Sequence, residues 1–70
     1  MLSFPGVSAG RADRLRRLTD MGCAVTIGRP LGEEGEVCLI EFRNRRVTGR
    51  GATPDAAAAD ALAQWDDGDG

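Results

Sequence analysis

Hydrophobic residues recur every three or four positions near the start of the chain, which is the spacing of an amphipathic helix. Ala12, Leu15 and Leu18 fall on one stripe, and charged residues occupy the opposite side. Ser8 is placed to accept backbone N–H groups at the first turn, where helices prefer such a side chain. The pattern therefore predicts a helix over residues 8–21.

Shorter apolar runs in the middle of the chain predict two strands. Residues 23–28, CAVTIG, alternate so that Cys23, Val25 and Ile27 share one face. Residues 37–42, VCLIEF, form the most apolar run in the chain and are expected to be the central strand. β-Branched residues favour strands in both places. The acidic sequence RPLGEEGE, rich in glycine, is expected to connect them flexibly.

A basic turn leads from the central strand into a short third strand. Asn44 in the sequence RNRR suits a left-handed turn position. Residues 47–49, VTG, are expected to form the third strand. Gly49 and Gly51 are expected to let the backbone bend away after it.

The second helix has a clear start signal. Thr53 is the expected N-cap, Pro54 fits the first helical position, and Asp55 complements the positive end of the helix dipole. The alanine-rich sequence that follows has high helix propensity. The expected buried stripe consists of Ala58, Ala61, Leu62 and Trp65.

This order of elements defines an α+β fold, α-β-β-β-α, with a three-stranded antiparallel sheet. Each helix has one apolar stripe to bury, so both helices are expected to pack on one face of the sheet. The 70 residues are predicted to form a single small domain, residues 1–70. Residues 1–7 are expected to be an extended arm, and residues 66–70 a frayed acidic tail.

Charge and composition narrow the function classes. The formal net charge is −2 and the isoelectric point is about 4.9, which weakens the case for sequence-independent nucleic-acid binding. All nine basic residues are arginine. No apolar run approaches the ~18 residues that would span a bilayer, and no secretory leader is recognisable. No membrane association is expected, and the chain is predicted to be cytoplasmic.

The sequence offers no catalytic constellation. It contains no histidine, and its two cysteines, Cys23 and Cys38, lie in apolar runs that would raise a thiol pKa. Two thiols alone do not complete a zinc site, so no metal and no cofactor are expected. Two interpretations of the cysteines stay open, namely two buried thiols or a cross-strand disulfide. The chain is predicted not to be an enzyme.

The junction GRGATPDAAAADAL, within this order of elements, resembles the double-stranded-RNA-binding domain. In that family a glycine-rich approach leads to a helix that opens with paired lysines, which clamp phosphates. Here Pro54 and Asp55 stand where those lysines would be. The resemblance therefore implies the fold and not the RNA-binding function.

Two further resemblances bear on function. Residues Gly49–Leu62 are similar to the strand-to-helix junction of HicB-like antitoxins. In size, acidity and the alanine run after a strand, the whole chain resembles small phage-encoded inhibitors of the anti-CRISPR type. That second resemblance implies a protein partner in a bacterial host cell.

Two charged surfaces are the candidate sites. A cationic groove that holds nucleic acid attracts exposed carboxylates through the same Coulombic field. The expected function is accordingly a non-catalytic protein-binding module, a phage or mobile-element inhibitor that blocks a nucleic-acid-handling effector such as a CRISPR complex, acting as a monomer or homodimer. The alternative is a nucleic-acid-binding or antitoxin-like regulator, and solvation alone also explains both surfaces. The acidic candidates are Glu33, Glu34, Glu36, Asp66 and Asp67; the basic candidates for the alternative are Arg43, Arg45, Arg46 and Arg50.

Overall fold

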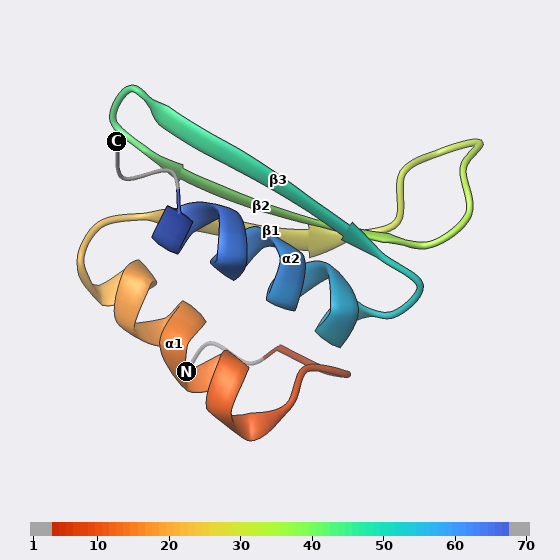
Figure 1. Cartoon of the computed structure of the whole chain (residues 1–70), viewed down its shortest axis with the longest axis horizontal. Helices are drawn as coiled ribbons and strands as arrows, with labels where there is room; N and C mark the ends of the chain where they lie inside the picture. Colours follow the sequence, from red (N-terminus) through yellow and green to blue (C-terminus); the bar gives the residue numbers. More distant parts are fainter. Residues whose placement is uncertain (1–3, 68–70) are drawn as a thin grey trace.

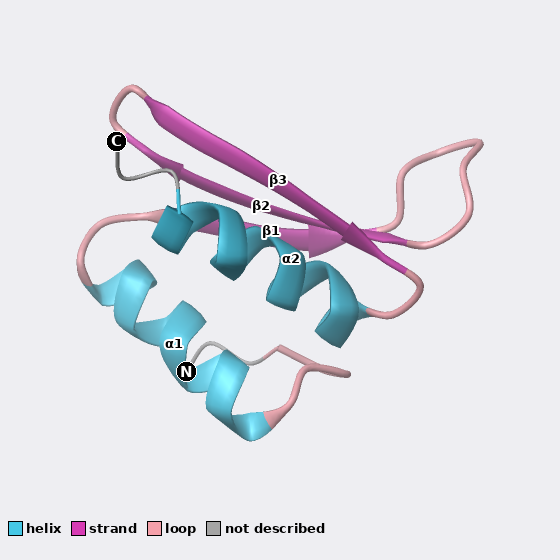
Figure 2. Cartoon of the chain, in the orientation of Figure 1, coloured by secondary structure: helices cyan, strands magenta, loops and turns pink. Residues whose placement is uncertain are grey.

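A computed structural model describes residues 4–67 and places two helices on one face of a three-stranded antiparallel sheet (Figures 1 and 2). The predicted α+β fold is therefore confirmed. The sheet order is β1-β2-β3, so β2 is central and the other two strands form the edges. In chain order the elements are α1 (Ala9–Asp20), β1 (Ala24–Gly28), β2 (Glu36–Phe42), β3 (Arg45–Gly51) and α2 (Pro54–Asp67).

The core lies between the sheet and the helices because each strand alternates its side chains between two faces. Cys38 and Ile40 of β2 point toward the helices and are fully buried. Trp65 packs against the core but is only half-buried, so small alanines and leucines supply most of the contact with the sheet. The buried residues are Leu15, Leu18, Cys23, Cys38, Ile40, Ala57, Ala58, Ala61 and Leu62.

Glycines in β3 let α2 lie directly on the strand. A Cβ atom added to Gly49 would lie 2.7 Å from the Cα atom of Ala61, closer than real side chains allow. A Cβ atom on Gly51 would lie 2.7 Å from the backbone of Ala56. The prediction that Gly49 bends the chain away was wrong, because Gly49 lies within the strand, where it admits the helix. Gly51 also admits the helix, but it is the last residue of the strand and the chain bends directly after it.

The third strand is longer than predicted, because pairing with β2 extends it in both directions. It pairs from Arg45 opposite Phe42 to Gly51 opposite Glu36, so only two residues make the turn. Arg43 occupies the left-handed position with φ 55°, and Asn44, which was predicted to do so, does not.

The segment before α1 is a turn and not the predicted extended arm. The N–H of Val7 donates to the carbonyl of Phe4 over 3.1 Å, and Gly6 has a φ of 80°. Ser8 is the N-cap of α1 but makes no side-chain capping bond. Its backbone N–H instead donates to Asp55 at the start of α2. Residues 1–3 of the predicted arm lie outside the described residues.

Helix α2 begins as predicted and ends later. The hydroxyl oxygen of Thr53 accepts from the N–H of Ala56 over 3.1 Å, which confirms the N-cap. The helix continues to Asp67, so the first two residues of the predicted frayed tail are helical. Residues 68–70 lie outside the described residues.

Candidate interaction surfaces

The predicted acidic surface is divided between two ends of the molecule. Glu33, Glu34 and Glu36 belong to the β1–β2 connection and the start of β2, at the right of Figure 1. Asp66 and Asp67 lie in the last turn of α2, at the left. The two acidic groups therefore do not form one continuous contact surface for a partner.

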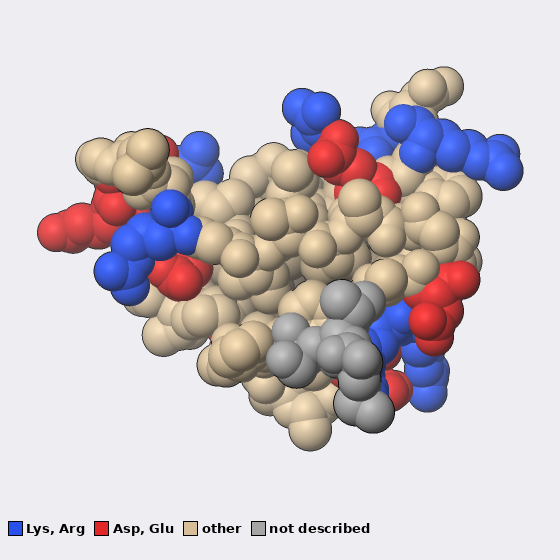
Figure 3. All heavy atoms as spheres, turned by 180° about the vertical axis from the view of Figure 1, so that it is seen from behind, with Lys and Arg blue, Asp and Glu red and all other residues tan. Residues whose placement is uncertain are grey.

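Three of these five carboxylates are paired with arginines. Glu33 lies 3.3 Å from Arg50, Glu36 lies 3.0 Å from Arg29, and Asp66 lies 2.7 Å from Arg14. Figure 3 shows the result on the rear face, where both signs of charge gather together around the rim and the centre is uncharged. The surface is therefore mixed in charge and is not a continuous polyanion.

The two remaining carboxylates belong to Glu34 and Asp67, one at each end of the molecule. Among residues 4–67, neither side chain forms an ion pair within 4.0 Å. Both residues are exposed. Each can contribute its charge to a partner without losing an internal contact.

The four arginines of the basic candidate surface are also divided. Three lie at the β2–β3 turn, whereas Arg50 lies at the far end of β3, where it pairs with Glu33. The guanidinium of Arg45 stacks 4.1 Å from the ring of Trp65 and donates to the Trp65 carbonyl. Arg46 pairs with Glu41 over 3.0 Å.

Arg43 differs from the other arginines of the turn. Its guanidinium lies 5.2 Å from the ring centroid of Phe42, and the residue is exposed. The left-handed conformation disfavours a residue with a side chain by roughly 1–2 kcal/mol, and glycine avoids this cost. The turn therefore holds an arginine at a position where glycine would fit better.

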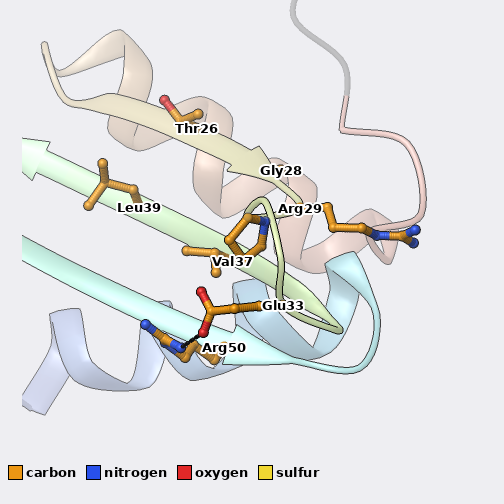
Figure 4. Close-up of a pocket in the computed structure, with 8 residues that line it drawn as sticks. Thr26, Gly28, Arg29, Glu33, Val37, Leu39 and Arg50 are labelled. Carbon is orange, nitrogen blue, oxygen red and sulfur yellow. Dashed lines mark hydrogen bonds and ion pairs between the residues drawn. The ribbon is translucent and has the colours of Figure 1, made fainter.

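An apolar cleft, which the sequence did not reveal, lies on the sheet face away from the helices. It has a volume of about 340 Å³, and its floor includes Val37 and Leu39. The β1–β2 connection forms one wall, and the ion pair between Glu33 and Arg50 forms part of the rim (Figure 4). Leu31, on the same connection, is 100% exposed. The sequence did contain a signal for this cleft. The strand VCLIEF has apolar residues on both faces, whereas the helices of the predicted fold cover only one face of the sheet.

The N-terminus of α2, where the RNA-binding resemblance would place lysines, is occupied by an internal contact. Asp55 accepts from the backbone N–H of Ser8 over 2.9 Å and from Arg11 over 2.8 Å. Both bonds lower the pKa of the Asp55 carboxyl, and the bond from the Ser8 N–H has the larger effect. Asp55 therefore joins the starts of the two helices.

A second ion pair joins α2 to α1 near the other end of α2. The hydrogen bond from Arg14 lowers the pKa of the Asp66 carboxyl. Arg14 and Arg11 lie one turn apart on α1, so two carboxylates of α2 hold the same face of that helix.

The two cysteines are free and buried, which is the first of the two interpretations left open by the sequence. Burial raises the pKa of the Cys38 thiol to about 11, and burial also raises the pKa of Cys23. Neither is a thiolate at neutral pH. Within residues 4–67 there is no cluster of three or more His, Cys, Asp or Glu side chains that could hold a metal ion.

Comparison with protein-family models, curated proteins and solved structures gives no match for this chain. Among the described residues, neither helix has the length and apolar character needed to cross a bilayer.

Proposed function

We propose that the chain is a non-catalytic protein-binding module that contacts its partner with the open face of the sheet and the β1–β2 connection. The observation that carries this proposal is the cleft over Val37 and Leu39, with its charged rim and the fully exposed Leu31 beside it. Protein interfaces typically have such an apolar centre surrounded by polar groups.

The charges around the cleft favour a protein over a nucleic acid. Arg50 and Arg29, the two basic residues at this end, are paired with Glu33 and Glu36. Phosphate groups would have to displace these carboxylates and would meet a chain with a net charge of −2. A protein surface can instead match alternating charges group by group.

A specific form of this proposal is an inhibitor from a phage or mobile element that occupies a nucleic-acid-handling effector, with a CRISPR complex as the sharpest case. It is supported by Glu34, whose exposed carboxylate lines a separate hollow that shares Arg50 with the cleft and has no arginine ion-pair partner among residues 4–67. The partner would present an apolar side chain flanked by basic groups, as the rim of a cationic groove does.

The test is affinity capture from a bacterial lysate, followed by mass spectrometry and a binding assay with the purified partner. Leu39→Thr removes part of the apolar floor and is expected to weaken binding at least about tenfold. Glu34→Lys reverses a charge in the hollow next to the cleft and is expected to reduce the association rate. Asp67→Lys is the matched control at the opposite end and should change neither quantity. If only Asp67→Lys weakens binding, the open face is not the interface.

A second candidate function is nucleic-acid binding at the β2–β3 turn. It is favoured by Arg43, because a strained residue in an exposed turn is a feature found at functional sites. This function predicts salt-sensitive retention of RNA or DNA in a gel shift, lost in Arg43→Ala and in Arg46→Ala. Absence of retention by the wild-type chain at moderate salt would exclude it.

A further inference from the structure

The outer edge of β3 is protected by side chains of α2. The backbone N–H of Arg50 donates to the Asp60 carboxylate over 2.9 Å. The carbonyl of Thr48 accepts from the Gln64 amide over 2.8 Å. Two backbone groups that would otherwise be open to another strand are thus satisfied within the chain.

These two bonds fix which backbone groups face which strand. In an antiparallel ladder, successive residues point their N–H and C=O groups alternately toward and away from the neighbouring strand. Arg50 and Thr48 point away from β2, so the residues opposite them, Val37 and Leu39, point away from β3 and toward β1.

The same alternation continues into β1. Gly28 and Thr26 lie opposite Val37 and Leu39, so these two residues exchange their backbone bonds with β2. It follows that Val25 and Ile27 point their N–H and C=O groups outward, at the free edge of the sheet.

Within residues 4–67, this edge lacks the hydrogen-bond protection that β3 has. Apart from the ladder with β2, no hydrogen bond joins a β1 backbone group to the described part of the chain. The strand reads AVTIG, without the proline or charged side chain that commonly blocks an edge. A cavity of about 440 Å³, lined by Phe4, Val25 and Ile27 among others, runs beside it.

We propose that β1 pairs antiparallel with β1 of a second copy of the chain, centred on Thr26, so that two sheets become one. With this centre, Val25 of each copy faces Ile27 of the other, and each such pair exchanges both N–H···O bonds. If the two-fold axis passed through any other residue, some of the outward N–H and C=O groups of Val25 and Ile27 would have no partner.

The strand is self-complementary in this register. Val25 and Ile27 make apolar cross-strand pairs on the helix side, and the two Thr26 side chains meet on the open face, so no charge opposes a like charge. Met21 and Leu31 lie in the turns that flank β1 on its two sides. These are the exposed large hydrophobic residues of the described chain, at 69% and 100% exposure. A two-fold interface brings the same surface of both copies together, so this self-complementarity favours a second copy of the chain over an unrelated strand.

This pairing goes beyond the proposed function, because it needs no molecule other than the chain itself. Its test is the oligomeric state of the purified chain, measured by sedimentation over a dilution series. We expect a dimer for the wild type. Thr26→Glu places two negatively charged side chains directly opposite each other across the axis, with Cβ atoms about 5 Å apart, and should raise the dimer Kd about tenfold or more.

Thr48→Glu is the matched control. Thr26 and Thr48 are both exposed and both lie opposite Leu39, on its two sides. Thr48→Glu should leave the dimer Kd unchanged within about twofold. A monomeric wild type, or equal effects of the two variants, would overturn the proposal.

A covalent measurement covers the case in which Thr26→Glu fails to fold. Two cysteines at the Thr26 position would face each other at a separation that a disulfide can bridge. Thr26→Cys is expected to give a covalent dimer on a non-reducing gel after mild oxidation, whereas Thr48→Cys is not. Failure of Thr26→Cys to cross-link, or equal cross-linking of both variants, contradicts the pairing.

Discussion

The two edges of the sheet are built from similar exposed threonines, yet one is closed and the other open. On β3, Asp60 and Gln64 of α2 bind the outward backbone groups. On β1, neither helix supplies an equivalent bond within the described residues. The difference arises because Gly49 and Gly51 let α2 settle on β3, which brings its polar side chains to that edge. The close packing of α2 on β3 therefore also protects the edge of β3.

Substitution of a strand glycine is expected to have the largest effect and to differ between the two edges. Gly49→Ala forces α2 off β3 and should lower the free energy of unfolding by about 3 kcal/mol. Gly28→Ala on β1 meets no atom within 4 Å and should change stability by less than about 1 kcal/mol. Urea denaturation measures both. Equal losses would contradict the close contact between α2 and β3.

Removal of the protecting side chains should make the two edges alike. The double variant Asp60→Ala/Gln64→Ala loses two hydrogen bonds to β3 and should be less stable by about 1–3 kcal/mol. With a second edge open, it should also form species larger than a dimer in sedimentation. Asp67→Ala, on the same helix, is the control and should show neither change.

Acid should loosen α1 from α2. The folded-state pKa values of Asp55 and Asp66 are lowered, so their contribution to stability is complete above the pKa of the unfolded carboxyls, near 3.8. It is lost as the pH falls through that value toward the folded-state pKa values. Thermal denaturation between about pH 6 and pH 3 should show this decline. In Asp55→Asn/Asp66→Asn the decline should be smaller.

Substitution by glycine should stabilise the β2–β3 turn but not the β1–β2 connection. The β1–β2 connection already has glycines at its left-handed positions, with φ values of 77° at Gly32 and 91° at Gly35. The β2–β3 turn has Arg43 at φ 55°. Arg43→Gly should therefore stabilise the chain by about 0.5–1 kcal/mol in urea denaturation. Asn44→Gly relieves no such conformation, and a gain equal to that of Arg43→Gly would contradict the assignment.

The order of elements could be predicted because their signals are local. Thr53 and Pro54 mark the start of α2, and the alternation in CAVTIG marks β1 within one residue. The length of β3 could not be predicted, since RRVTGRG has no apolar alternation and pairs only because β2 lies beside it. For the same reason, the role of Gly49 required knowledge of where α2 lies.

The candidate surfaces were less predictable than the fold. Most of their residues are exposed as expected, but Glu36 and Arg45 are partly buried. Residues that are close in the sequence were grouped into one surface, whereas the fold places them at different ends of the molecule. Arg11 pairs with Asp55 across 44 positions, and Arg14 pairs with Asp66 across 52. Sequence spacing predicts ion pairs only within one helix, such as those of Asp13 with Arg16 and Arg17. It does not predict pairs between different elements. The apolar cleft likewise depends on which sheet face the helices leave open.

The contact between Ser8 and Asp55 has a consequence for how the chain is made. The Asp55 carboxylate that receives the Ser8 N–H is synthesised 47 residues after Ser8. A nascent chain that carries only α1 and the first two strands lacks both α2 and the carboxylates that anchor α1. These native contacts of α1 therefore cannot form before α2 has been synthesised.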